Sequence, residues 1–480
     1  LEGQVRSPLE DHRERDMSVA IALFTRDLRV HDNPVLHAAC QAATEVVPLF
    51  VLDKAIITGG SMSANRAVFL AGALTDLDAN LRGIDGSLVV RSGSVVDEVE
   101  HMVAELGAGE VHLAADVSGY SQRREQVLRK RLAGHRCRVR VHANSITVAE
   151  PGALTPSGGG AHFAVFTPYY RRWVAASTRR LLDTPGRITV PPIATEAVPS
   201  LEEMCPEEMC AGPRSPQLPP GGETAGRRVL GDWLAGRIQR YEQAHDDLAG
   251  DGTSRLSPYL HFGCVSPTEV LRTIDRSAPG GEAFIRQLAW RDFHHQVLAA
   301  RPDTSTVDYR TRHDRWRRDD AAAKAWRDGR TGYPIVDAGM RQLQQQGWMH
   351  NRARLITASF LTKTLYLDWR IGARHFLDLL VDADLANNQL NWQWVAGTGT
   401  DTRPNRVLNP LRQAQRYDPT GDYVRRYLPE LRGIPGPAVH QPWKLDSPQR
   451  ANLDYPDPII DLRDGADYFR SVRDKIGGEQ

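Results

Sequence analysis

The stretch at residues 19–53, VAIALFTRDLRVHDNPVLHAACQAATEVVPLFVLD, decides the fold of the amino-terminal part of this chain. It opens with a short apolar run, continues through a polar loop and a helical pattern at residues 34–43, and closes on a second apolar run. Short apolar runs joined through a helix are typical of parallel strands that are buried on both faces. The stretch therefore predicts a strand, a helix and a second strand of an α/β sheet.

The same alternation continues to about residue 145. Further strand-like runs are SLVVRSG, EVHLAA and RVRVHA, and helical patterns occupy NRAVFLAGALTDLDANL and VVDEVEHMVAELG. Strands that alternate with helices predict a parallel sheet covered on both faces. We therefore expect a Rossmann-like α/β domain with a parallel sheet at residues 17–145. The motif GxGxxG does not follow the first strand, so an ordinary dinucleotide site is not indicated there.

The rest of the chain divides by composition. Residues 146–225 are rich in Pro, Gly and Glu and predict a connector with one short helix around TPYYRRWVAAS. Helical periodicity dominates residues 226–444, for example in GRRVLGDWLAGRIQRYEQ, EAFIRQLAWRDFHHQVLAA and RARLITASFLTKTLY, and predicts an all-α domain. We expect residues 445–480 to form a tail over the surface, and residues 1–16 to be a disordered leader before a natural start at Met17.

Composition excludes several classes of protein. The chain has 480 residues, a formal net charge of +1 and 41% hydrophobic residues, and no apolar run is long enough to span a bilayer. The first residues are too polar for a signal peptide. Five scattered cysteines support neither a disulfide framework nor a zinc site, and we expect Cys205 and Cys210 to be two ordinary thiols. We therefore predict a cytoplasmic protein without a bound metal.

Charge is distributed unevenly. Residues 226–444 hold 32 Lys and Arg against 24 Asp and Glu, a balance of +8, so the remainder carries −7. This asymmetry favours binding of a polyanion by the helical domain, although most charges on any surface are simply solvated.

Two polar stretches in the helical domain indicate a ligand. The stretch 382–394, DADLANNQLNWQW, places many carboxamides and carboxylates beside an apolar run, where they are costly to bury without partners. The stretch 252–263, GTSRLSPYLHFG, offers hydroxyls and an arginine that could hold phosphate, although an ordinary helix cap would look alike. Seven of the ten Trp lie between residues 290 and 394 among Arg and Asn, a mixture suited to core packing or to stacking on bases or a flat cofactor.

These motifs resemble those of the photolyase/cryptochrome flavoproteins. GTSRLSPYLHFG, QLAWRDF, TGYPIVDAGMRQLQQQGWMHNRARLITASFLTKTLYLDWR and DADLANNQLNWQWVAGTGTD follow in the family's order, and TRDLRVHDNP resembles its amino-terminal signature. The resemblance covers roughly residues 18–444 and is nearest to class I cyclobutane pyrimidine dimer photolyases. It implies a monomer without an obligate protein partner that binds UV-damaged DNA. Excited reduced FAD would donate an electron to the dimer and recover it after the ring splits.

The resemblance also assigns roles to residues. It implies that FAD is held by Tyr241, Thr253, Ser254, Arg255, Leu256, Ser257, Trp290, Arg354, Asp382, Asp384 and Asn388. It implies catalytic roles for Asn388, near flavin N5, and for Gln287, and an electron path through Trp392, Trp369 and Trp316. It implies contacts with DNA or the lesion by Gln287, Trp290, Asn351, Arg352, Trp394 and Arg406.

Two positions bear on the substrate. Most class I relatives have Glu where this chain has Gln287, and Gln is usual in the branch that repairs (6–4) photoproducts. That branch uses two His at the places of Asn351 and Leu355, and Leu cannot do acid/base work. We therefore expect cyclobutane dimer repair, with (6–4) repair or a cryptochrome photoreceptor as the alternatives.

The resemblance further implies a second, antenna chromophore in or beside the α/β domain. Folate binders commonly use a Lys that residues 301–316 lack, so methenyltetrahydrofolate is disfavoured. We expect 8-hydroxydeazaflavin, bound by Arg26, Asp53 and Asp116, although the pocket could equally be an ordinary groove. His261 stands where a deazaflavin binder has Lys, and we expect it to be partly charged at neutral pH.

Overall fold

Five parallel strands form one sheet in the amino-terminal half of the computed structural model, which describes residues 19–59, 62–207 and 210–478. The predicted leader at residues 1–16 and the predicted start at Met17 lie outside the described residues. The strands, in the order β3-β2-β1-β4-β5, are β1 (Val19–Phe24), β2 (Glu45–Asp53), β3 (Val89–Gly93), β4 (Glu110–Ala114) and β5 (Arg138–His142). All five strand predictions are confirmed.

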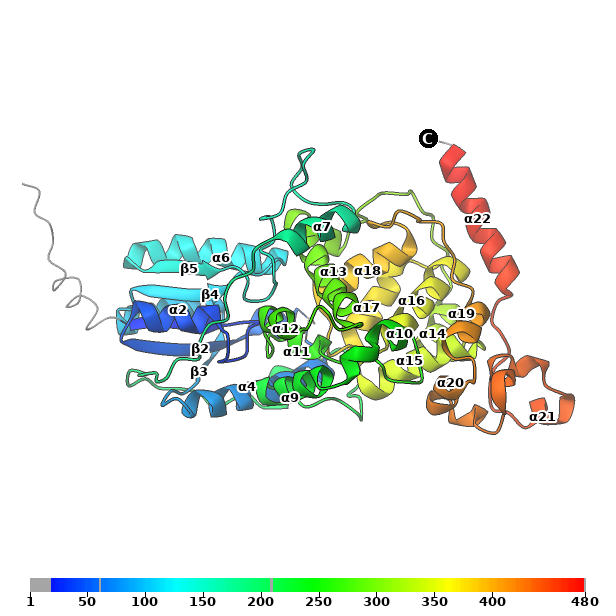
Figure 1. Cartoon of the computed structure of the whole chain (residues 1–480), viewed down its shortest axis with the longest axis horizontal. Helices are drawn as coiled ribbons and strands as arrows, with labels where there is room; N and C mark the ends of the chain where they lie inside the picture. Colours follow the sequence, from blue (N-terminus) through cyan, green and yellow to red (C-terminus); the bar gives the residue numbers. More distant parts are fainter. Residues whose placement is uncertain (1–18, 60–61, 208–209, 479–480) are drawn as a thin grey trace, which may run out of the picture.

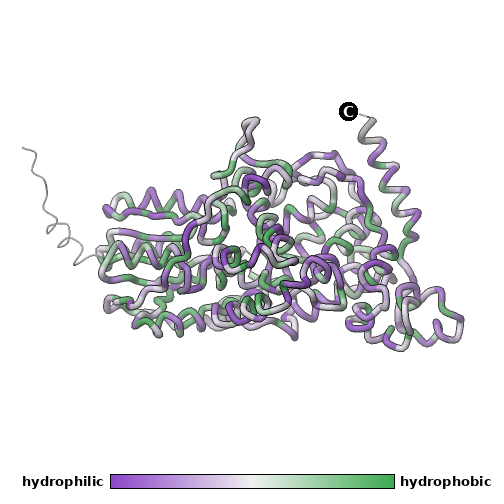
Figure 2. Tube along the Cα trace, in the orientation of Figure 1, coloured by the Kyte–Doolittle hydropathy of each residue, from purple (hydrophilic) through white to green (hydrophobic). Residues whose placement is uncertain are grey.

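Helices cover both faces of this sheet, as predicted (Figure 1). The helices are α2 (Pro34–Ala42), α3 (Lys54–Thr58), α4 (Ala64–Arg82), α5 (Val95–Leu106) and α6 (Gly119–Leu132). Alternate residues of β1 enter two different cores: Ala22 packs with α2 and α4, whereas Ile21 packs with α5 and α6. Asn33 begins α2 by accepting hydrogen bonds from two backbone N–H groups. Apolar and polar segments alternate along the covering helices (Figure 2).

The connector contains more structure than expected. Helix α7 (Phe166–Ala175) confirms the one predicted helix, and Asp292 anchors the connector by accepting hydrogen bonds from the indole of Trp173 and from two backbone N–H groups. A second short helix, α8 (Leu201–Met204), ends beside a disulfide between Cys205 and Cys210. The prediction of two ordinary thiols is therefore wrong. The two Cα atoms are 4.9 Å apart, within bonding range for a disulfide.

The second half is helical, as predicted. Its helices are α9 (Glu223–Leu234), α10 (Tyr241–Ala244), α11 (Ser257–His261), α12 (Pro267–Thr273), α13 (Gly281–Ala300), α14 (Asp320–Asp328), α15 (Pro334–Gln346), α16 (Asn351–Ser359), α17 (Trp369–Leu379), α18 (Leu385–Ala396), α19 (Pro410–Tyr417) and α20 (Asp422–Tyr427). The pattern at residues 226–243 is broken, since α9 ends before Gly236. The pattern at 352–366 changes after α16 into a π-helical turn, η4 (Phe360–Thr364).

The carboxyl-terminal segment is part of the packed structure rather than a tail that merely covers it. It carries α21 (Ser447–Ala451) and α22 (Leu462–Gly478). The phenol of Tyr455 donates to the buried Asp337, and Phe469 of α22 is fully buried against the helical half. An apolar residue that is fully removed from water contributes roughly 1.5–3 kcal/mol.

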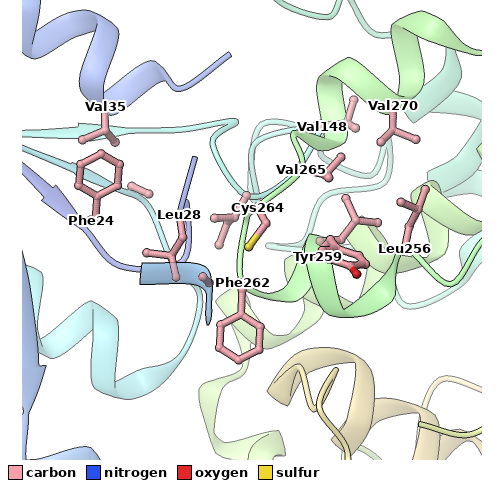
Figure 3. Packing of buried hydrophobic residues seen from close by; sticks show 14 of the residues in the cluster. Phe24, Leu28, Val35, Val148, Leu256, Tyr259, Phe262, Cys264, Val265 and Val270 are labelled. Atoms are coloured by element: carbon pink, nitrogen blue, oxygen red, sulfur yellow. The ribbon is translucent and has the colours of Figure 1, made fainter. Parts of the chain in front are cut away.

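One apolar core joins the two halves of the molecule. Figure 3 shows Leu28 of the α/β half near Phe262 and Cys264 of the helical half, in one cluster that also contains Phe24 and Tyr259. At Gly263, with a φ of +68°, a Cβ atom would lie 2.0 Å from the carbonyl oxygen of Arg26. The loop after β1 and the turn after α11 can pack this closely only because residue 263 has no side chain. The domain boundaries drawn from composition stay predictions, because one cluster of buried residues includes members from both halves of the chain.

Candidate functional site: a cavity in the helical half

A cavity of about 460 Å³ opens in the helical half. It is lined by most of the predicted cofactor and lesion residues: Tyr241, Thr253, Ser254, Arg255, Leu256, Ser257, Gln287, Trp290, Asn351, Arg352, Arg354, Asp382, Asp384 and Trp394. A second cavity of about 80 Å³ shares Arg354 and Asp382 with the first and adds Asn388 and Trp392. Ligand pockets in proteins usually measure about 300–1,000 Å³, so this one can hold a large cofactor.

The segment before α11 forms a polar end of the cavity. The hydroxyl of Thr253 is buried and has no hydrogen-bond partner among the described residues, which is costly unless a ligand or water completes it. Arg255 has a φ of +55°, and its guanidinium lies 4.0 Å from the ring centre of Trp348. A bulky residue in this backbone region is uncommon and is found where function constrains the chain. The Trp348 indole donates to the Ser257 hydroxyl at 3.1 Å.

An ion pair crosses the middle of the cavity. The guanidinium of Arg354 donates to both carboxylate oxygens of Asp382, at 2.8 and 3.0 Å, and to the Met349 carbonyl at 2.9 Å. The Asp382 side chain is 2% exposed, so removal of Arg354 would leave a buried negative charge. Both residues are among those that the motifs implied for FAD.

Asp384 begins α18 and stays charged. Its Oδ1 accepts from the backbone N–H of Asn387, and its Oδ2 pairs with Arg26 and lies 3.3 Å from Nε2 of His295. Burial alone would raise the pKa of this carboxyl, but His295 and Arg26 hold it well below its usual range. Burial, assisted by Arg26, lowers the pKa of His261 well below its usual value. His261 is therefore neutral at neutral pH, and the expectation of partial charge is wrong.

Asn388 is held in one orientation on the next turn of α18. Its amide nitrogen donates at 3.0 Å to the Ala373 carbonyl and at 3.0 Å to the side-chain oxygen of Gln389. The carbonyl oxygen of Asn388 is therefore the group left for a ligand in the smaller cavity.

Of the three predicted relay tryptophans, Trp392 lines the smaller cavity. Trp392 packs against Gly372, which lies one helical turn after Trp369 on α17. Trp369 is fully buried and donates to Asp308 at 2.9 Å. Trp316 is half-buried, and its neighbour Arg317 forms a β-bridge with Leu367. Trp316 therefore lies beside the segment that precedes Trp369. Trp392 also contacts Trp326, at 5.9 Å between ring centres.

The predicted DNA residues do not form a single group. Gln287, Asn351 and Trp394 line the cavity and remain at least partly exposed, and Trp290 stacks on Phe166 at 3.7 Å between ring centres. Arg406 is exposed and does not line either cavity.

Arg352 is not a free cation at the rim of the cavity. It binds both carboxylate oxygens of Asp246 at 2.7 Å and lies 4.4 Å from the ring centre of Tyr417. Sequence reasoning missed Asp246 and also His294, which lines the cavity and whose buried Nε2 has no partner among the described residues. The helical pattern around His294 does not distinguish a ring that lines a cavity from one that packs in a core.

The predicted antenna residues lie at the carboxyl ends of neighbouring strands, Arg26 after β1, Asp53 at the end of β2 and Asp116 after β4. The strand order reverses between β1 and β4, where α/β sheets usually bind ligands. All three side chains already have protein partners: Arg26 pairs with Asp116 at 3.3 Å, and Asp53 accepts from the phenol of Tyr120.

Neither a metal site nor a membrane-spanning helix is found in the described part of the chain. Among these residues, no group of His, Cys, Asp and Glu is arranged to hold a metal ion. Within the same residues, none of the helices is both long enough and apolar enough to traverse a bilayer.

Known proteins match this chain over nearly its whole length. Residues 20–189 match the model of the DNA photolyase family, and residues 284–473 match that of the FAD binding domain of DNA photolyase. A deoxyribodipyrimidine photo-lyase of Streptomyces griseus is 57% identical, covering 95% of this chain and 99% of its own.

Solved structures agree with these matches. A bacterial class III photolyase of Agrobacterium tumefaciens superposes with a TM-score of 0.87 at 32% identity, covering 96% of this chain and 98% of its own. A Synechocystis cryptochrome superposes with a TM-score of 0.86 at 29% identity, covering 95% and 99%. These matches show that the chain belongs to the DNA photolyase family.

Proposed function

We propose that this chain is a photolyase that uses light and FAD to split cyclobutane pyrimidine dimers in DNA. The observation that carries the proposal is the near full-length identity of 57% to a deoxyribodipyrimidine photo-lyase. The cavity supports it independently, because the residues that the motifs implied for FAD meet around one space of sufficient size. We also infer a monomeric, cytoplasmic protein.

The residues of the cavity fit FAD. The unpartnered hydroxyl of Thr253 and the cationic Arg255 suit a pyrophosphate. The Nε2 of His294 also lacks a hydrogen-bond partner among the described residues and could bond a further polar group of the cofactor. When bound, FAD supplies the electron that light makes available. Arg354 would offer positive charge to a bound flavin, while Asp382 would keep the pair neutral overall. The Asn388 carbonyl oxygen can accept a hydrogen bond and so favours a protonated nitrogen opposite it.

We infer that the tryptophans and the cavity rim serve two separate tasks. Trp392, Trp369 and Trp316 would pass an electron inward from the surface. Trp290 and Trp394 would offer aromatic faces to a flipped, poorly stacked dimer, which costs less to extrude than an intact pair. Arg406, together with the positive balance of this half, would bind phosphates.

Illumination of a dimer-containing oligonucleotide with the purified holoprotein tests the proposal. We expect the dimer to disappear under blue or near-UV light and to persist in the dark. Persistence under light, together with light-dependent spectral changes of the flavin, would support a photoreceptor like the cryptochrome relative instead. The same oligonucleotide with a (6–4) photoproduct tests the substrate. Leu355 lines the cavity beside Asn351, so neither position offers an acid, and we expect no (6–4) repair.

We propose 8-hydroxydeazaflavin as the antenna chromophore, bound near Arg26, Asp53 and Asp116. The support is their common position at the strand ends, at the reversal of strand order. The existing partners of these side chains and the neutral state of His261 weigh against a strongly charged pocket. Reconstitution with each pigment, followed by absorption spectroscopy, decides the matter. Binding of methenyltetrahydrofolate, or of neither pigment, would refute this assignment without touching dimer repair.

A further inference from the structure

A buried lysine lies beneath the loop that follows α18. Lys363, in the π-helical turn η4, is 2% exposed, and its ammonium donates to the carbonyl oxygens of Pro404 at 2.9 Å and of Arg406 at 2.6 Å. The ring centre of Phe469 lies 5.7 Å from the same nitrogen. Lysine is almost never fully buried unless it is paired, so this position calls for an explanation beyond packing.

The loop at residues 397–406 has one buried side and one exposed side. Asp401 is buried and caps the backbone N–H of Arg403 at 2.8 Å, and the Arg406 N–H returns to the Arg403 carbonyl at 3.1 Å. Arg403 and Arg406 are exposed, and within the described residues neither pairs with an acidic side chain. The loop begins three residues after Trp394, which lines the cavity. Two free cations are thus carried on a backbone turn whose carbonyls Lys363 holds.

We propose that Lys363 is a positioning residue for DNA binding, which fixes the turn from Pro404 to Arg406 so that Arg403 and Arg406 meet backbone phosphates. The proposal rests on the proposed function, since it takes DNA as the ligand. A cation holding two carbonyls makes stronger hydrogen bonds than a neutral donor would, and its charge adds to the positive potential under the two arginines.

Protonation of Lys363 should therefore matter to binding. Burial lowers the pKa of this ammonium to about 7, Asp401 opposes that change, and Arg473 and Arg406 add to it. DNA, as a polyanion, favours the protonated form. Affinity should be greatest below about pH 7 and should fall as the pH rises through the pKa.

Binding can be measured in the dark, apart from repair. We suggest anisotropy of a labelled duplex containing one dimer, with the FAD-loaded protein at fixed salt between about pH 6 and about pH 9. At the lower pH, Lys363→Met should weaken binding about fivefold to tenfold, because one or two phosphate contacts lose their geometry. The flavin absorption spectrum and the repair yield of DNA-saturated enzyme should not change. Lys130→Met removes an exposed lysine of α6 and should change affinity less than about twofold.

A double-mutant cycle separates positioning from general structural damage. If Lys363 acts through Arg406, then Lys363→Met should weaken binding much less in an Arg406→Ala background than in the wild type. The fall in affinity above about pH 7 should also be smaller in both single variants. Additive effects, or an unchanged pH profile in Lys363→Met, would overturn the proposal.

The surface variant provides a test if Lys363→Met does not fold. Arg406→Ala alone should reduce the pH dependence of binding, and a profile identical to that of the wild type would overturn the proposal. Failure of dimer repair under light with these dark-binding results intact would instead count against the proposed function.

Discussion

Replacing Gly372 with alanine should displace Trp392, the first tryptophan of the proposed relay. A Cβ at Gly372 would lie 2.1 Å from Cη2 and 2.4 Å from Cζ3 of Trp392, and 2.7 Å from a methyl group of Leu361. Ordinary carbon contacts are about 3.5–4.0 Å, so the ring would have to retreat by roughly 1.5 Å. It cannot do so freely, because Phe376 and Trp326 pack against it.

The energetic cost follows from this overlap. Overfilling a packed core costs about 1–3 kcal/mol, and the better helix propensity of alanine returns up to about 1 kcal/mol. We therefore expect the free energy of unfolding of Gly372→Ala to fall by about 1–2 kcal/mol in urea denaturation. Photoreduction of oxidised flavin under steady illumination with an external reductant should slow, because the displaced ring changes the distances along the electron path.

A second glycine provides the matched control. Gly231 is also helical, in α9, and a Cβ there would meet no atom within 4 Å. Gly231→Ala should leave photoreduction unchanged and should be as stable as the wild type or more so. The reasoning would be refuted if Gly372→Ala unfolded at the wild-type urea concentration and photoreduced at the wild-type rate.

Three further predictions concern the relay, the substrate and pH. Trp392→Phe should abolish photoreduction of oxidised flavin but leave repair by chemically reduced enzyme largely intact; full photoreduction would remove Trp392 from the path. Gln287→Glu should retain or improve dimer repair in an oligonucleotide assay, whereas (6–4) repair by the unmodified protein would contradict our choice of substrate. Acidification from about pH 7 to about pH 5 should lower the free energy of unfolding, since burial lowers the pKa of His294, His350 and His375 to about 4 while unfolded imidazoles take up protons near about 6.5. Equal urea midpoints at the two pH values would disprove this.

Local sequence patterns predicted the sheet well and part of the helical half. Strands β1 and β2 are short apolar runs buried on both faces, so their patterns need no distant partner. Helix α18 carried no such signal and was not predicted as a helix. Its polar residues Asn388 and Gln393 are buried together with its apolar residues. Asn388 lines the smaller cavity, and Gln393 bonds the neighbouring loop, so the buried face of the helix is not an apolar stripe.

Tertiary pairings could not be derived from local patterns. Arg26 and Asp384 are separated by 358 positions, and their contact depends on how the two halves dock. The disulfide was missed for a different reason: the short helix before Cys205 lies in a proline-rich segment whose composition indicates only a loop. Arg352 looked like a solvated or phosphate-binding cation because its partner, Asp246, lies 106 residues away.

The Arg26 guanidinium belongs to both predicted chromophore sites, since it bonds Asp116 on one side and Asp384 on the other. An exchange of the α/β half for that of a relative would therefore also change the electrostatics of the helical half. An isolated helical half would leave Asp384 with His295 but without its arginine. In chimeras made to alter light harvesting, residue 26 and the turn around Gly263 should accordingly come from the same parent protein.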